Sequence, residues 1–308
     1  MEAAGGGLME IIQGMDTTLG LERVLTIGTF DGVHKGHLKI LNTLRAEAER
    51  RKAVSTVLTF EPHPRVVLAR SGKAPGVKLL TTFEEKMALL EAQKVDDVVV
   101  IRFDEAFSKL SYQAFFEKYI VSRMHLKCLV VGHDHAFGRD RRGNHDAISA
   151  LSQKQHFDVT RVDAFHLEGE AVSSSKIRRL LSEGRVGQAT PLLGYPYSLS
   201  GTVVPGDARG RLLNFPTANV KPECADKLIP REGVYAVDVV HKNRIFKGMM
   251  NIGYRPTFNK NAFALEVHIL NFNETIYGDI LTIRFKKRLR DEKKFASKEA
   301  LIEQLNID

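Results

Sequence analysis

Residues 24–37 read Val24-Leu25-Thr26-Ile27-Gly28-Thr29-Phe30-Asp31-Gly32-Val33-His34-Lys35-Gly36-His37. A short apolar run leads into a glycine-rich turn, after which Leu38, Leu41 and Leu44 recur at helical spacing. This order predicts a strand, a turn and a helix N-terminus, where free backbone N–H groups and the helix dipole bind anionic oxygens. His34 and His37 lie one helical turn apart, so we expect both to face one phosphate and to offset its developing charge. A strand–turn–helix with solvated histidines is the alternative.

Strand-like runs alternate with helical patterns from Val24 to about Leu193. The predicted strands cover 24–27, 54–60, 97–101, 127–131 and 158–162, and the predicted helices cover 37–52, 82–93, 111–121 and 174–183. This alternation is typical of an α/β fold with a doubly wound parallel sheet and helices on both faces. Ligands of such folds bind beyond the carboxyl ends of the strands, which is where 28–37 falls.

The pattern changes after Tyr197. Short strand-like segments at 198–204, 234–240, 245–252, 264–270 and 280–285 are separated by Gly, Pro, Asn and Asp, followed by a helix over 297–305. This pattern indicates a mostly β fold, an antiparallel barrel or sandwich. Glycines and prolines cluster within 187–197. We therefore predict a flexible segment over 1–20, a first domain over 21–190 and a second over 191–308.

Composition excludes several classes of protein. Hydrophobic residues at 43% and charged residues at 27% are typical of a soluble globular chain, and no apolar run is long enough to span a bilayer. The first residues lack the pattern of a secretory signal, and two distant cysteines provide no disulfide framework, so we expect a cytoplasmic protein without a membrane partner. Cys128, His133, His135 and His145 lack the paired spacing of a zinc site.

The net charge of +8 raises the alternative of a nucleic-acid-binding protein. Most of the imbalance lies within 284–298, which holds eight Lys or Arg against two acids. The chain has no Trp and no known nucleic-acid-binding signature. A basic surface near a site for phosphorylated small molecules explains the charge equally well, and we expect no nucleic-acid partner.

Several motifs resemble one enzyme family in its own order. Residues 34–37 (His-Lys-Gly-His) carry the HxGH signature of nucleotidyltransferases. Three further motifs follow it, at 59–64 (Thr-Phe-Glu-Pro-His-Pro), 131–138 (Val-Gly-His-Asp-His-Ala-Phe-Gly) and 173–178 (Ser-Ser-Ser-Lys-Ile-Arg). Together these resemble the FMN adenylyltransferase half of prokaryotic bifunctional FAD synthetases.

The resemblance implies roles for particular residues. ATP would be bound by Gly28, Thr29, Phe30, Asp31, Gly32, His34, His37, Ser174, Ser175 and Arg178, with the two histidines catalytic. His63 and Asp134 would lie on the flavin side. The physical chemistry agrees, because serines at a helix start offer hydroxyls and free N–H groups, and Arg178 offers a guanidinium fork. A plain helix cap is the alternative for the serines.

The second half resembles the riboflavin kinase signature over 201–211 and 214–219. The resemblance implies ATP binding by Gly201, Val203, Gly206, Gly210 and Arg211, Mg²⁺ binding by Thr217 and Asn219, flavin binding by Arg290, Glu292 and Phe295, and a catalytic base at Glu266. Two neutral oxygens two residues apart on a strand face the same side, and such oxygens suit Mg²⁺. Without the flanking motifs, Glu266 would be a surface glutamate.

The resemblance implies a riboflavin kinase barrel that converts riboflavin and ATP to FMN, and a nucleotidyltransferase domain that converts FMN and ATP to FAD and pyrophosphate. The expected ligands are riboflavin, FMN, FAD, ATP and Mg²⁺, and we expect a monomer or weak oligomer. His135 replaces an aromatic residue and Asn214 replaces a glycine of the family pattern. These departures leave open the alternative that only one activity is present and that the other domain is a binding or regulatory module.

Overall fold

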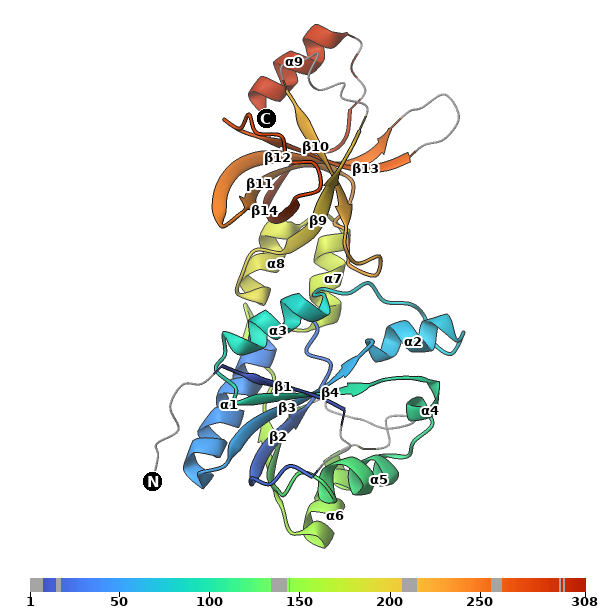
Figure 1. Cartoon of the computed structure of the whole chain (residues 1–308), viewed down its shortest axis with the longest axis vertical. Helices are drawn as coiled ribbons and strands as arrows, with labels where there is room; N and C mark the ends of the chain where they lie inside the picture. Colours follow the sequence, from blue (N-terminus) through green and yellow to red (C-terminus); the bar gives the residue numbers. More distant parts are fainter. Residues whose placement is uncertain are drawn as a thin grey trace. The chain divides into compact units, whose positions relative to one another are not determined.

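The computed structural model describes residues 8–14, 18–133, 143, 145–206, 215–255, 262–293, 295 and 297–308. Contacts divide the chain into two compact units, Met1–Ser174 and Ser175–Asp308. Both are drawn in Figure 1. Among the described residues, no helix is both long enough and apolar enough to cross a membrane.

The first unit contains a six-stranded sheet in the order β1-β4-β3-β2-β5-β6, and every neighbouring pair is parallel. Its strands are β1 (Glu10–Gln13), β2 (Arg23–Ile27), β3 (Val54–Glu61), β4 (Asp97–Arg102), β5 (Leu126–Gly132) and β6 (Asp158–Val162). Strands β2 and β4 are buried along almost their whole length, as expected for a parallel sheet covered on both faces. The predicted parallel α/β architecture is confirmed.

Strand β1 corrects one prediction. We predicted a flexible segment over 1–20, but residues 10–13 pair in parallel with 97–100 of β4 at one edge of the sheet. The run is only four residues long and mostly exposed, so it carries little hydrophobic signal. Its partner lies more than 80 residues away in sequence, and a pairing at that separation is not visible in local pattern.

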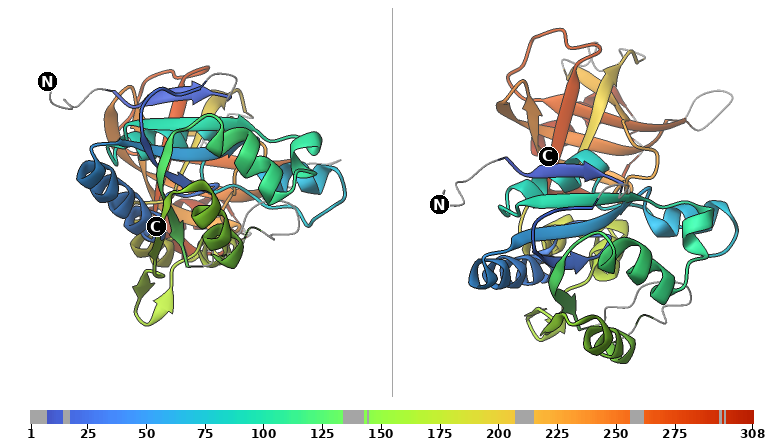
Figure 2. Two further views of the ribbon diagram at one scale, coloured as in Figure 1. Left: turned by 90° about the horizontal axis from the view of Figure 1, so that it is seen from below. Right: turned by 60° about the horizontal axis from the view of Figure 1, so that its bottom comes forward.

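Two separate cores lie on the two faces of this sheet. Alternate residues of the strands point to opposite faces: Val24 packs in one core and Leu25 in the other, and Val57 and Leu58 divide likewise. The core that contains Val24 is covered by α1 (Lys35–Arg51) and α3 (Phe83–Glu91). The core that contains Leu25 is covered by α5 (Tyr112–Phe115), the π-helix η1 (Phe116–Val121) and α6 (His145–Gln155). Figure 2 shows α1 in blue and α5 and α6 in green beside the strands. The sheet is therefore doubly wound.

The remaining elements of this unit are short. They are α2 (Pro64–Arg70), α4 (Glu105–Ser108) and a hairpin of β7 (His166–Leu167) and β8 (Glu170–Ala171). The helices predicted over 37–52, 82–93 and 111–121 correspond to α1, α3 and the α5–η1 pair. Helices α2 and α6 were not predicted.

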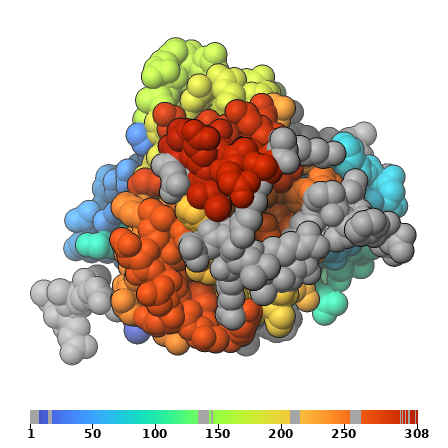
Figure 3. Space-filling view, turned by 90° about the horizontal axis from the view of Figure 1, so that it is seen from above, coloured from blue at the N-terminus to red at the C-terminus, as the bar shows by residue number. Residues whose placement is uncertain are grey.

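The second unit is built around a closed antiparallel barrel in the order β10-β13-β12-β11-β14-β9. Its strands are β9 (Ser198–Val204), β10 (Thr217–Pro222), β11 (Gly233–His241), β12 (Arg244–Arg255), β13 (Ala262–Ile269) and β14 (Ile280–Arg290). Burial alternates strictly along β9, because every second side chain points into the barrel. The predicted antiparallel β-barrel is confirmed. Helix α9 (Lys298–Ile307) appears in dark red on the surface of this unit in Figure 3.

Helices α7 (Ser174–Ser182) and α8 (Val186–Leu193) precede the barrel. The backbone N–H of Arg231 donates to the carbonyl of Leu181 at 3.1 Å, and a Cβ on Gly184 would meet Arg288 of β14 at 2.5 Å. These contacts explain why the compact second unit begins at Ser175, earlier than the predicted boundary at 190/191. The Gly/Pro cluster behind that prediction lies partly inside a helix, since α8 contains Pro191 and ends at the left-handed Gly194.

Candidate active sites

The turn 28–34 connects β2 to α1 and ends in a histidine cap. His34 is the N-cap of α1, and its Nδ1 accepts a hydrogen bond from the backbone N–H of His37 at 3.3 Å. The two imidazole rings stack with centroids 3.7 Å apart and planes at 13°. Because Nδ1 accepts, the proton of a neutral His34 ring lies on Nε2, which is then a donor. The structure therefore brings the two predicted histidines together at a positive helix end.

Two glycines, one in this turn and one in the first turn of α1, are required by their surroundings. Gly32 has a φ of +85°, a left-handed conformation that side chains disfavour. Gly36 has a different reason, because a Cβ there would lie 3.0 Å from Cε1 of His34. The absence of a side chain at 36 thus leaves room for the stacked rings.

The side chains of Phe30 and Asp31 point into the protein, although we predicted both residues to bind ATP. Phe30 is 2% exposed and belongs to the core under α1. The Asp31 carboxylate accepts hydrogen bonds from the backbone N–H groups of Leu80 and Thr81 at 2.9 and 3.0 Å and from the Thr81 hydroxyl at 3.2 Å. These residues therefore shape the turn with their side chains and leave only backbone groups for a nucleotide.

The predicted serine and arginine residues divide between the two units. The hydroxyl of Ser174 donates to the carbonyl oxygen of Asp31 at 3.0 Å, so this serine lies against the glycine-rich turn. Ser175 and Arg178 belong to α7 in the second unit, and their approach to the turn stays a prediction. Asp134 lies outside the described residues.

His63 follows the end of β3 and caps α2. It is 8% exposed, and its Nδ1 accepts from the backbone N–H of Arg65 at 3.1 Å. The ring is therefore held in place at the carboxyl edge of the sheet, where ligands of parallel sheets bind.

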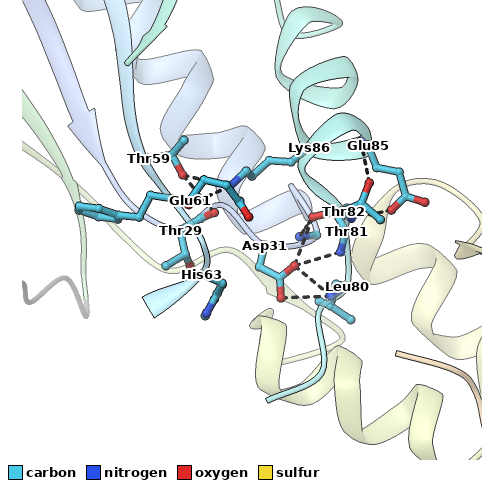
Figure 4. Close-up of polar contacts among 12 residues, drawn as sticks. Thr29, Asp31, Thr59, Glu61, His63, Leu80, Thr81, Thr82, Glu85 and Lys86 are labelled. Carbon is cyan, nitrogen blue, oxygen red and sulfur yellow. Dashed lines mark hydrogen bonds and ion pairs between the residues drawn. The ribbon is translucent and has the colours of Figure 1, made fainter. Parts of the chain in front are cut away.

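A buried lysine lies beneath this edge, and sequence reasoning missed it. Lys86 of α3 is 5% exposed, with its Nζ 3.4 Å from Oγ1 of Thr59, 3.3 Å from the Phe60 carbonyl oxygen and 3.6 Å from Oε2 of Glu61. Figure 4 shows it reaching from α3 toward β3. Burial lowers the pKa of Lys86, partly offset by the Glu61 carboxylate. Its burial could have been predicted from its position in the helical stripe that also contains the buried residues Met87 and Leu90.

In the barrel, strand register brings the predicted kinase residues into one row. Asn219 of β10 pairs with Glu266 of β13, which pairs on its other side with Asn251 of β12, and Thr217 pairs with His268. The neighbours Val220, Val267 and Ile252 are buried in the barrel, so the alternating row faces outward. Directly paired side chains have Cβ atoms about 5 Å apart. The prediction that Thr217 and Asn219 share a face is confirmed, and Glu266 lies next to them.

A cavity of about 90 Å³ adjoins this row. It is lined by residues of β9, β10 and β13, by Gly206 and Pro216 between β9 and β10, and by the loop after β13: Val203, Gly206, Pro216, Thr217, Ala218, Asn219, Val267, Ile269, Phe272, Glu274, Thr275, Ile276 and Tyr277. Gly206 is pressed against Asn219, because a Cβ at 206 would overlap the side-chain amide of Asn219. The lining combines polar oxygens with the apolar side chains of Phe272 and Ile276, which suits a ligand with a charged and an apolar part.

Not every predicted ATP residue lines this cavity. Gly201 does not, and a Cβ there would meet the Lys221 carbonyl oxygen at 2.5 Å, so its role is the close packing of β9 on β10. Gly210 and Arg211 lie outside the described residues.

Three residues were predicted to bind the flavin in the barrel. The guanidinium of Arg290 is held by the carboxylate of Asp308, with Nε 2.8 Å from Oδ1, and it lies 5.7 Å from the centroid of the Phe295 ring. Glu292 instead accepts from Nδ2 of Asn251 at 2.9 Å and therefore adjoins the row that contains Glu266. The described contacts thus tie Arg290 to α9 and Glu292 to the candidate site.

The described part of the chain shows no metal centre built from acidic or sulfur ligands. Among the described residues, no three His, Cys, Asp or Glu side chains gather closely enough to hold a metal ion. Cys128, considered above for zinc, is buried within β5, and burial raises the pKa of its thiol. Mg²⁺ binding by Thr217 and Asn219 stays a prediction, and their oxygens suit this ion, which binds few protein ligands and keeps waters and phosphate oxygens.

Comparison with known proteins agrees with both halves. The FAD synthetase family model matches residues 18–176, and the riboflavin kinase family model matches 193–308. A bifunctional riboflavin kinase/FMN adenylyltransferase of Listeria monocytogenes is 40% identical over 94% of this chain and 90% of its own length. One from Escherichia coli K12 is 38% identical over 92% of this chain and 90% of its own.

A solved structure, described as a macrolide-efflux protein from Streptococcus pneumoniae, has a TM-score of 0.86 and 30% identity, with 97% of each chain covered. The fold and the two family matches define a two-domain flavin-nucleotide transferase. The chain belongs to the family of bifunctional riboflavin kinase/FMN adenylyltransferases. It phosphorylates riboflavin to FMN and adenylylates FMN to FAD, and both halves match, so the comparisons do not favour the alternative of a single activity.

Proposed function

We propose that FAD is formed at the turn between β2 and α1. ATP lies over the backbone of 28–32 with its α-phosphate at the α1 N-terminus, where the rings of His34 and His37 stabilise the charge that develops on phosphorus. A phosphate oxygen of FMN attacks the α-phosphorus, the bond to the β-phosphate breaks, and pyrophosphate leaves. The ionised FMN phosphate needs no general base, so positioning and electrostatics provide the rate. The observation that carries this proposal is the stacked histidine pair at a helix N-terminus.

The remaining assignments to this site follow the family motifs. Ser174, Ser175 and Arg178 hold the β- and γ-phosphates of ATP, and His63 and Asp134 lie on the flavin side. The hydrogen bond from Ser174 to Asp31 supports the placement of the first of these residues.

FMN is formed on the outer face of the barrel. Glu266 accepts the proton of the riboflavin 5′-hydroxyl as its oxygen attacks the γ-phosphorus of ATP, and ADP leaves. ATP occupies the cavity beside Thr217 and Asn219, and Glu292 and Phe295 contact the flavin. The register that aligns Asn219 with Glu266 carries this assignment.

Mg²⁺ is proposed to be held by Thr217 and Asn219 together with ATP oxygens. When bound, it would neutralise charge on the transferred phosphoryl group. The close approach of Gly206 to Asn219 and the place of Asn219 on β10 support this proposal. We further propose a cytoplasmic monomer or weak oligomer that binds no nucleic acid. Light scattering and salt-dependent nucleic-acid binding assays test these last points.

Two substitutions in the full chain test the assignment of the sites. His37→Ala should lower FAD formation from FMN by at least about 100-fold while FMN formation from riboflavin is unchanged, because the lost group acts on one transition state. Glu266→Gln should have the reverse effect. Flavins are separated by chromatography after incubation with ATP and Mg²⁺. Loss of both activities in both variants would contradict the two-site assignment.

A further inference from the structure

Lys86 is a buried cation to which the mechanism above gives no role. Its side chain lies inside the first unit, between α3 and the end of β3, and its ammonium group has three polar neighbours on β3. Burying an ammonium group is unfavourable, and a methionine of similar volume would fill an apolar stripe without that cost. A charged residue at this place is therefore better explained by what it holds than by stability.

One of its contacts leads to the nucleotide turn. The ammonium of Lys86 donates to the hydroxyl of Thr59, and this hydroxyl in turn donates to the carbonyl oxygen of Thr29 at 3.3 Å. Thr29 belongs to the backbone that we assign to ATP. A chain of two hydrogen bonds thus connects Lys86 to the part of the site that we assign to ATP.

The other contacts of Lys86 lead to the segment that we assign to FMN, the acceptor of the adenylyl group. Lys86 also donates to the carbonyl oxygen of Phe60 and pairs with the carboxylate of Glu61, at the point where β3 ends and the chain continues to His63. The Glu61 side chain is 38% exposed, so this pair reaches the surface of the carboxyl edge. Burial raises the pKa of Glu61, and the neighbouring Lys86 counteracts that rise.

Helix α3, which carries Lys86, is itself fastened to the same turn. Its N-terminus has a capping box: the Thr82 hydroxyl accepts from the Glu85 N–H, and the Glu85 carboxylate accepts from the Thr82 N–H. The two preceding residues, Leu80 and Thr81, bind the Asp31 carboxylate, and the Gly32 N–H donates to the Thr81 hydroxyl at 3.1 Å. Figure 4 shows both attachments, Asp31 to 80–81 and Lys86 to 59–61.

We infer that Lys86 is a positioning residue for FAD formation, which sets the distance between the ATP-holding turn 28–34 and the acceptor-side segment 59–63. The inference rests on the proposed assignment of these two segments. Lys86 contacts no reacting atom in this role and acts through Thr59 and Glu61. Its loss should therefore misalign two bound substrates rather than prevent either from binding.

Lys86→Met in the full chain tests this role. A misplacement on the order of 1 Å lowers a rate by about 100-fold, so we expect kcat of FAD formation to fall by about that factor while KM for FMN and for ATP in that reaction change less than about threefold. FMN formation by the same chain is the internal reference. Lys86→Gln, which keeps a neutral N–H donor, should retain more activity than Lys86→Met.

Two further variants separate positioning from stability. Lys73→Met is the matched control, because Lys73 forms an exposed pair with Glu105 at 2.8 Å in the same unit, and it should leave FAD formation unchanged. Glu61→Gln should have a smaller effect than Lys86→Met, and the double variant Lys86→Met/Glu61→Gln should resemble Lys86→Met, since the two residues act through one contact.

Three outcomes would overturn the inference. The first is an unchanged kcat of FAD formation in Lys86→Met, and the second is a rise in both KM values with kcat retained. The third is a fall in the thermal midpoint of Lys86→Met that is large enough to explain its loss of FAD formation, together with an equal fall in Lys86→Gln. His37→Ala in the same assay distinguishes this failure from failure of the ATP site. If His37→Ala retains FAD formation, the assignment of the turn is wrong whatever Lys86 does.

Discussion

The two candidate sites are held together in different ways. The first is a turn whose polar groups are held by segments distant in sequence. The N–H groups of 80–81 bind the carboxylate of Asp31, and the hydroxyl of Thr59, which contacts Lys86, binds the carbonyl oxygen of Thr29. The second is a row on the outer face of a barrel, aligned by the register of neighbouring strands at Asn219 and Glu266. A row set by backbone pairing tolerates the loss of a side chain, whereas a turn set by buried side chains does not. Substitutions of supporting residues should therefore harm FAD formation more than FMN formation.

The strongest test of this difference is Asp31→Ala. The substitution leaves the buried N–H groups of Leu80 and Thr81 without their acceptor, which should destabilise the first unit by about 3 kcal/mol. FAD formation should fall by at least about 100-fold, with FMN formation retained. Unfolding of the full chain followed by circular dichroism, together with both activities, provides the measurement. Full FAD formation would show that the turn keeps its shape without the carboxylate.

Adding one methyl group at each site gives a second, smaller test. In Gly36→Ala the new Cβ would press on the ring of His34, and in Gly206→Ala it would displace the amide of Asn219. We expect the first to lower FAD formation alone and the second FMN formation alone, each by about 10-fold, the effect of roughly 1.4 kcal/mol on a barrier. Gly76→Ala is the control, because its nearest neighbour would be 3.7 Å away. Equal loss of both activities in either variant would argue against separate sites.

The smallest effect is expected from Asp308→Asn, which concerns stability alone. Burial disfavours the charge of Asp308, but hydrogen bonds from Arg290 and Gln304 outweigh it and hold the pKa of the carboxyl below its ordinary value. Because the folded pKa is depressed, the stabilisation is present above the ordinary value of about 4 and is lost as pH falls through the folded pKa.

The variant should thus be less stable than the parent by about 1–2 kcal/mol at pH 7. The difference should shrink as pH falls below about 4. Thermal unfolding at several pH values measures it. A difference in stability that stays constant down to about pH 2 would show that the charge of Asp308 does not stabilise the fold. A large loss of FMN formation would instead support the predicted binding of flavin by Arg290.

Local pattern was sufficient for most of the long elements of the fold, although it missed helices α2 and α6 and strand β10. Five of the six parallel strands and helices α1, α3 and α7 were predicted, because long apolar runs and helical stripes carry their own signal. It failed for β1, which is short and paired with a remote strand, and for α8, whose Pro191 and flanking glycines resemble a linker. In both cases tertiary packing outweighs weak local preference.

In the candidate sites, too, some features follow from local sequence pattern and others only from tertiary packing. Sequence by itself determined that His34 lies beside His37 and that Thr217 shares a face with Asn219, because these spacings follow from helical and strand periodicity. Only the tertiary structure decided that Asp31 faces inward, that Gly201 serves packing, that Arg290 binds Asp308 and that Lys86 lies beneath the turn. The direction of a side chain and its partner depend on segments tens of residues away, and no local pattern records which of them will be neighbours.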